Sequence, residues 1–209
     1  MPEPTEPSQT WEVEVTFDVD ERTAAPDWRV LPGVASVDAP EQRELDARYF
    51  DTEDYVLGRA HYALRRREGG PDEGWHLKGP RQGAARLETG WALGDEFDEE
   101  DPVPGRIRTA ITDLTDRPLG EIARIRNSRT AVVLRDAQGG VIAEFVDDRV
   151  RAVDVRHGTE RTWREWEIEL GPAAPRDHGR FFAAVRELCF DAGACDALTD
   201  SKLARALGL

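Results

Sequence analysis

The stretch WEVEVTFDVD, residues 11–20, alternates apolar and polar side chains, which is the pattern of a β-strand with one buried face. Its polar face carries Glu12, Glu14, Thr16 and Asp18. Carboxylates two residues apart on a strand lie roughly 7 Å from each other. Their repulsion is weak in water but grows when the face is enclosed. A strand of this kind therefore needs something to balance its negative charge.

Charged rows recur on later segments, with cations on some and carboxylates on others. HYALRRREGG, residues 61–70, places Arg65 and Arg67 on one face, and TWREWEIELG, residues 162–171, does the same for Glu165, Glu167 and Glu169. Solvent-exposed sheet faces can also produce such rows. However, glutamate rows beside arginine and lysine rows suit a polyanion such as a triphosphate with bound Mg²⁺ or Mn²⁺. Hard cations prefer carboxylate oxygens, and guanidinium groups bind phosphates.

Composition narrows the class of protein. The chain has 209 residues, of which 39% are hydrophobic and 33% charged, and its formal net charge is −14. This balance is typical of a compact soluble protein that repels nucleic acid and anionic lipid. The N-terminus lacks a signal peptide, and no apolar run reaches the ~20 residues of a membrane helix. We therefore expect a cytoplasmic protein without a nucleic-acid or membrane partner.

The order of periodic segments predicts a strand-dominated chain with a helical C-terminus. Residues 1–9, with three prolines, are expected to form a disordered tail, followed by a single domain over 10–209. Turn residues in EGGPDEG (68–74) and DAQGG (136–140) predict two hairpins, and the acidic segment 94–105 predicts a loop. Helical periodicity covers 105–115, 177–193 and 196–209. A period of two predicts strands at 10–19, 43–51, 60–68, 74–79, 85–93, 121–136, 140–149, 150–157 and 161–170.

Taken in order, these motifs resemble the CYTH superfamily, also called triphosphate tunnel metalloenzymes. Glu12 and Glu14 match the glutamates of its opening ExExK strand. The resemblance continues through YFDTEDYVLGRAHYALRRREGG (49–70), GWHLKGP (74–80), RLE (86–88), ARIRNSRT (123–130), EFVDD (144–148), REWEIELG (164–171) and SKLARAL (201–207). It implies an α+β fold: a closed antiparallel eight-stranded β-barrel with a charged tunnel inside, and flanking and C-terminal helices.

The resemblance also implies roles for individual residues. Asp148 would support a second metal or orient the attacking water, Glu88 would be the middle catalytic carboxylate, and Lys202 would lie on a helix that closes over the tunnel. The implied ligands of Mg²⁺ or Mn²⁺ are Glu12, Glu14, Glu144, Asp148, Glu165, Glu167 and Glu169. The implied triphosphate-binding residues are Arg65, Arg67, Lys78, Arg86, Arg124, Arg126, Arg129 and Lys202.

One position departs from the family pattern. Thr16 stands where the opening strand has its lysine, and its hydroxyl has neither the charge nor the reach to grip a phosphate. The leading hypothesis is a metal-dependent triphosphatase acting on inorganic triphosphate or a small organic triphosphate, as a monomer or homodimer. A class IV-type adenylate cyclase and a non-catalytic module that binds triphosphate or polyphosphate are the alternatives.

Overall fold

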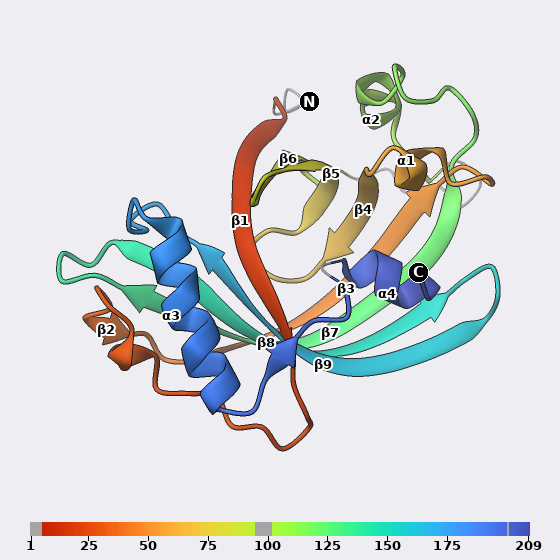
Figure 1. Ribbon diagram of the computed structural model, residues 1–209. Helices are drawn as coiled ribbons and strands as arrows, with labels where there is room; N and C mark the ends of the chain where they lie inside the picture. The colour runs from red at the N-terminus through yellow and green to blue at the C-terminus, as the bar shows by residue number, and fades with distance from the viewer. Residues whose placement is uncertain (1–5, 95–101, 200) are drawn as a thin grey trace.

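The computed structural model describes residues 6–94, 102–199 and 201–209. Within these residues, eight strands form a closed antiparallel barrel in the order β1-β6-β5-β4-β3-β7-β8-β9, and β9 pairs back with β1 (Figure 1). This confirms the predicted α+β barrel. The barrel strands are β1 (Ser8–Asp18), β3 (Glu41–Asp51), β4 (Ala63–Glu68), β5 (Gly74–Gln82), β6 (Ala85–Trp91), β7 (Gly120–Arg135), β8 (Val141–Asp154) and β9 (Thr159–Leu170).

β1 closes the barrel by pairing with a different strand in each half. Its first half pairs with β6 as far as Val13, which lies opposite Ala85. From Glu14, which lies opposite Glu169, it pairs with β9. The glutamates of the opening strand and of the last long strand are thereby brought side by side.

Shorter elements cover the barrel and its ends. β2 (Ser36–Val37) pairs with β7, and β10 (Cys195–Asp196) pairs with β1. The expected helices at 177–193 and 196–209 correspond to α3 and α4, each of which begins at a side-chain cap, Asp177 and Ser201 respectively. The helices are η1 (Trp28–Val30), α1 (Val56–Arg59), α2 (Gly105–Ala110), α3 (His178–Asp191) and α4 (Lys202–Leu207).

Several boundaries differ from the sequence predictions. The helix expected at 196–209 is limited to α4 (Lys202–Leu207), because Asp196 pairs with β1 as part of β10, and the helix expected at 105–115 is limited to α2 (Gly105–Ala110). The strands expected at 140–149 and 150–157 are one strand, β8, because no turn residue separates Arg149 from Val150 and the ladder to β9 is unbroken from Ala143 to Asp154. β1 begins at Ser8, ahead of the expected start at residue 10. Residues 1–5 of the tail expected at 1–9 lie outside the described residues, as do residues 95–101 of the acidic segment 94–105.

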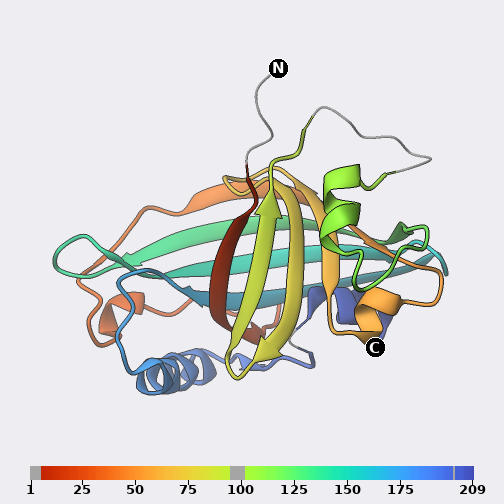
Figure 2. The ribbon, with the colours of Figure 1, turned by 90° about the horizontal axis from the view of Figure 1, so that it is seen from above.

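Among the described residues, two of the three apolar clusters lie on the outside of the barrel, and the third, which includes Ala47 and Ile125, lies inside it beneath α4. Figure 2 shows α3 lying along the outside of the barrel. Phe17, Phe145 and Trp166 share an apolar cluster with Phe181 and Val185 of this helix. A second cluster places Trp75 and Trp91 against Ile107 of α2. Because side chains alternate along each strand, this packing turns the polar rows toward the barrel interior. No helix within the described ranges is both long enough and apolar enough to cross a membrane.

Candidate metal and phosphate site

The barrel encloses a polar cavity of about 100 Å³. Strands β1, β3, β4, β5, β6, β7 and β9 and helix α4 all contribute to its wall. Most of the predicted site residues therefore meet in one place, although they come from distant parts of the sequence. The predicted residues that line the cavity are Glu12, Glu14, Arg65, Arg67, Lys78, Arg86, Arg129, Glu167, Glu169 and Lys202.

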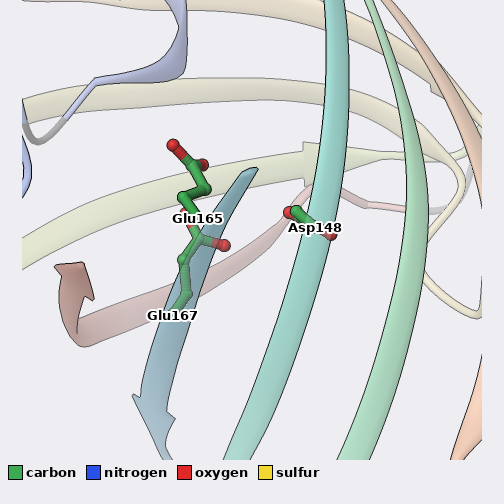
Figure 3. A group of neighbouring side chains, drawn as sticks. All are labelled: Asp148, Glu165 and Glu167. Atoms are coloured by element: carbon green, nitrogen blue, oxygen red, sulfur yellow. The ribbon is translucent and has the colours of Figure 1, made fainter. Parts of the chain in front are cut away.

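A group of three carboxylates lies on β8 and β9. Asp148, Glu165 and Glu167 each present an oxygen within 4.8 Å of the others (Figure 3). The ammonium of Lys202, from α4, lies among them and contacts all three, at 3.1 Å from Asp148. Arg129 adds two hydrogen bonds to Asp148, of 2.8 and 2.7 Å, and Asn127 adds a third, of 3.1 Å. The group is suited to a divalent cation, and in this conformation a lysine balances its charge.

Burial and charge act in opposite directions on these groups. Burial alone would raise the pKa of Asp148 and of Glu167, but Lys202 and Arg129 outweigh it and lower both. For Glu165 burial prevails, and its pKa is raised. Burial would lower the pKa of Lys202, but the three carboxylates raise it instead, so the lysine is charged.

A second carboxylate group lies at the seam between β1 and β9. Glu14 is opposite Glu169, and Lys78 contacts the neighbouring Glu12 through a bond of 2.6 Å. Burial, together with the charges of Glu12, Glu14 and Glu167, raises the pKa of Glu169 to about 7, although Lys78 opposes the shift. Negative charge here exceeds the nearby positive charge, which is the condition in which a hard cation binds.

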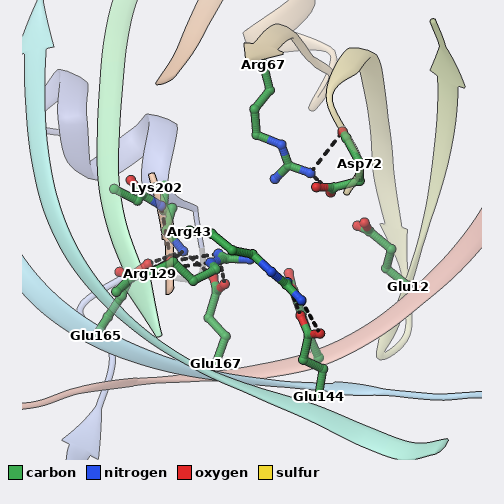
Figure 4. A network of polar contacts seen from close by, with 12 residues as sticks. Glu12, Arg43, Arg67, Asp72, Arg129, Glu144, Glu165, Glu167 and Lys202 are labelled. Atoms are coloured by element: carbon green, nitrogen blue, oxygen red, sulfur yellow. Dashed lines mark hydrogen bonds and ion pairs between the residues drawn. The ribbon is translucent and has the colours of Figure 1, made fainter. Parts of the chain in front are cut away.

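The facing wall of the cavity has the opposite excess. Burial and the charges of Arg65 and Arg129 lower the pKa of Arg67 to about 9, because cations crowd one another there. Arg67 pairs with Asp72, as Figure 4 shows from close by. Crowded guanidinium groups that face a cavity favour an anion with several charged oxygens.

Glu88 lies within this cationic wall. It contacts His76 at 2.7 Å, Lys78 at 3.4 Å and Arg65 at 3.5 Å. Burial would raise the pKa of Glu88, but its hydrogen bond to His76 and the charges of Arg65 and Lys78 lower it. The geometry thus places Glu88 where it can hold three basic side chains in position.

Glu144 lies further along β8, away from the three-carboxylate group. Arg43 of β3 bonds to it at 3.0 Å and also to Glu41 at 2.7 Å (Figure 4). Arg43 was not predicted, because it lies at the start of a strand whose inner face is otherwise apolar in this region. In this conformation Glu144 is the partner of an arginine.

Two predicted phosphate-binding residues face the other way. Arg124 and Arg126 bond to Asp46 on the outer side of the barrel, at 2.6 to 3.1 Å. On β7 the inner face belongs to Asn127 and Arg129, which line the cavity. Side chains that differ by one or three positions on an unbroken strand face opposite sides. We therefore leave Arg124 and Arg126 out of the proposed site.

Sequence reasoning also missed two residues that face the interior. Asn127 is buried and donates to Asp148, yet a lone asparagine within ARIRNSRT carries no signal of its own. Arg81 lies 3.9 Å from Glu14, although the alternation of β5 counted from Lys78 would point it outward. Thr16, opposite Glu167, lines a side cavity with Arg81.

The fold and the site together define a barrel protein whose interior has an excess of carboxylates at one wall and of basic side chains at another. The family model described as the CYTH domain matches residues 11–192. The chain belongs to the CYTH domain family.

Known proteins resemble the chain in sequence and in fold. The uncharacterized protein Rv2226 of Mycobacterium tuberculosis (strain ATCC 25618 / H37Rv) is 36% identical over 213 residues, covering 97% of this chain but only 41% of that protein. The chain thus spans about two fifths of the length of this relative.

Two solved structures share the fold at low sequence identity. An adenylate cyclase-like protein from Bacillus halodurans has a TM-score of 0.64 at 19% identity, over 94% of this chain and 97% of that one. HpAC1 from Hippeastrum, a candidate adenylyl cyclase with a dominant triphosphatase activity, has a TM-score of 0.57 at 13% identity, over 95% of both chains.

Proposed function

We propose that this CYTH domain is a metal-dependent triphosphatase that hydrolyses inorganic triphosphate or a small organic triphosphate inside the barrel. The observation that carries the proposal is the opposed charge excess of one cavity. Arg67, at one wall, is crowded by cations, while Glu169, at another, is crowded by carboxylates. A chain of phosphates with a bound divalent cation would balance both charges: the phosphates would neutralise the cations around Arg67, and the metal ion would neutralise the carboxylates around Glu169.

The basic side chains would bind the phosphates. Arg65, Arg67, Arg86 and Arg129 line the cavity, and each guanidinium can donate to two phosphate oxygens. Electrostatic stabilisation of this kind supplies most of the catalysis in phosphoryl transfer. Glu88 would keep Arg65 and Lys78 oriented, since it contacts both.

The carboxylate groups fit a hard cation, because each combines several carboxylate oxygens in a small space. Asp148, Glu165 and Glu167 would hold one ion, and Glu12, Glu14 and Glu169 are candidates for another. A bound Mg²⁺ or Mn²⁺ would neutralise charge on the phosphates.

Lys202 and Asp148 would change partners during the reaction cycle. For the three-carboxylate group to hold a cation, Lys202 must leave it, and its ammonium is then available to a phosphate oxygen in the cavity that it lines. Asp148, whose pKa is lowered, is a weak base. We therefore assign it to orienting the attacking water rather than to removing a proton in a separate step.

The test is phosphate release by the purified protein with Mg²⁺ or Mn²⁺ and triphosphate. Glu12→Gln, Glu167→Gln and Arg129→Gln should each lower kcat/KM by a factor of about 100 or more. Arg126→Gln is the matched control, since it removes the same charge from the outer face of the same strand. Triphosphate binding without turnover would replace the enzyme with a binding module.

A second cavity favours an organic triphosphate as the substrate. It measures about 690 Å³, and its lining includes Tyr55, Tyr62 and Leu207. Its wall shares Ala63, Arg86, Ser201 and Leu203 with the polar cavity. Parallel assays with ATP and thiamine triphosphate would reveal a preference for an organic group, and formation of cyclic AMP would favour the cyclase.

We propose the cytoplasm as the place of action and a triphosphate or polyphosphate as the partner. Nucleic acid and anionic membranes are disfavoured as partners, because the net charge of the chain is −14. Whether the protein acts as a monomer or as a homodimer is decided by its mass in solution.

A further inference from the structure

The side cavity beside Thr16 lies where β1 separates from β6. Pairing between these strands stops at Val13, opposite Ala85, because the β5–β6 hairpin turns back there. A cavity of about 390 Å³ lies here, and its lining includes Glu14, Thr16, Arg81, Arg186 and Asp196. Glu14 also lines the main cavity, so this residue borders both spaces.

A β-bulge brings Arg81 into this position. Lys78 lies opposite Glu88, and Arg81 lies opposite Arg86, so three steps along β5 match two steps along β6. In a regular strand, residues three apart face opposite sides. The extra residue in the Gly79–Pro80 segment restores Arg81 to the side that Lys78 and Arg86 occupy. The bulge thus adds an arginine to the inner face.

The charge around Glu14 gives this arginine a role. Glu12, Glu14 and Glu169 lie together at the seam, and Lys78 bonds to Glu12 at the far end of the row. Thr16 brings no charge. The Arg81 guanidinium lies 3.9 Å from Glu14, and its side chain is 26% exposed.

We propose that Arg81 binds the substrate phosphate nearest Glu14, and that it supplies from β5 the positive charge that β1 lacks at Thr16. The assignment rests on the proposed triphosphate function. It makes Arg81 a phosphate-binding residue that alternation alone does not predict. Because Thr16 and Arg81 line the same cavity, a lysine introduced at position 16 would place its ammonium in the space that the guanidinium now serves.

The test removes the positive charge of Arg81 from β5 and adds one at position 16 of β1. Binding of imidotriphosphate, a non-hydrolysable triphosphate analogue, is measured by calorimetry with Mg²⁺, and KM and kcat are measured with triphosphate. Arg81→Gln should weaken binding and raise KM by about tenfold while largely keeping kcat. The double variant Thr16→Lys/Arg81→Gln should regain most of the affinity, and Thr16→Lys alone should change little because a cation is already present.

Two further variants separate binding from folding and from general charge effects. Arg186→Gln is the matched control, since Arg186 lines the same cavity from α3, where it pairs with Asp196 of β10, and the affinity of this variant should stay at the wild-type value. Arg81→Lys keeps the charge if Arg81→Gln fails to fold, and it should bind within about threefold of the wild type.

The results decide between the proposals. Wild-type affinity in Arg81→Gln, or a double variant as weak as Arg81→Gln, would overturn the role of Arg81 while leaving the triphosphatase intact. A wild-type protein that neither binds the analogue nor hydrolyses triphosphate would overturn the proposed function itself, and this inference with it.

Discussion

Glu169 is a proposed metal ligand whose carboxyl group has a pKa near neutrality. Burial and its carboxylate neighbours raise its pKa from 4.5 to about 7, so the metal-free fold favours the protonated form. A raised pKa gives its stabilising contribution below about 4.5, and that contribution is lost as the pH rises through about 7. Glu169 is an exposed residue, so solvent screening reduces the size of the effect.

We predict that Glu169→Gln removes this pH dependence. In the absence of divalent cations, the Tm of the variant should rise relative to that of the wild type between pH 5 and about 8. Mg²⁺ should bind the wild type more tightly as the pH rises through about 7 and should bind the variant weakly throughout. Thermal melting at several pH values, with EDTA or Mg²⁺, measures both. A constant Tm difference would show that Glu169 does not titrate in this range.

Single residues also show what a sequence can predict. Arg126 and Arg129 are three positions apart on a ladder without a break, so they could not both face the tunnel. Alternation exposes the conflict, but only the pairing with β3 and β8 shows that Arg129 is the inner one. For Arg81, alternation gives the wrong face, because a β-bulge between Lys78 and Arg81 shifts the register. Such a bulge is visible only once the pairing with β6 is known.

At the scale of elements, α4 packs against the barrel and places a lysine among the buried carboxylates. Leu203 and Leu207 pack against apolar residues of β7 and β8, and Lys202 extends from the same helix to the three carboxylates. Arg205 pairs with Asp18 of β1. The helix therefore links β1, the first strand of the barrel, to β8 and β9, the last two. Its attachment depends on ion pairs between largely buried side chains.

We predict that Lys202→Met destabilises the metal-free protein by about 3–5 kcal/mol, because it leaves buried carboxylates with too little positive charge. Mn²⁺ should restore stability to this variant more strongly than to the wild type, since no lysine competes with the ion. Chemical denaturation with and without Mn²⁺ provides the measurement. Arg205→Met is the control: it should lower stability without a larger response to Mn²⁺. An equal Mn²⁺ response in the wild type and in Lys202→Met would contradict the idea.

The elements themselves could largely be predicted from periodicity. The long strands and α3 follow from alternation and from helical spacing in single segments. The very short elements α1, β2 and β10 could not be predicted, because two to four residues are too few for a periodic signal. Their positions are set by contacts with distant strands.

At the scale of the molecule, the net negative charge of the chain has the same sign as the proposed triphosphate ligand and would repel it. The main cavity is lined by Glu12, Glu14, Asp72, Glu167 and Glu169, but also by Arg65, Arg67, Lys78, Arg86, Arg129 and Lys202. The formal charge of −14 therefore comes from elsewhere in the chain. An anionic substrate approaches a surface that repels it before it reaches the cations.

We predict that salt accelerates the association of triphosphate. Raising the ionic strength from about 0.01 M to about 0.15 M shortens the Debye length from ~30 Å to ~8 Å, which screens the outer surface more than the enclosed cavity. The association rate constant, measured by stopped flow at constant Mg²⁺ activity, should rise a few-fold. A decrease with salt would mean that the cavity cations, rather than the outer surface, control the approach.

The seam between β1 and β9 also has a consequence for folding kinetics. Glu14 and Glu169 come from the first and last long strands, so their pairing closes the longest loop in the barrel. Contacts of such high sequence separation form late, and half of the carboxylates at the seam cannot meet the other half until then. An ion bound across this seam would act as a noncovalent staple between distant parts of the chain. Its effect would fall on the rate of opening rather than on the rate of folding.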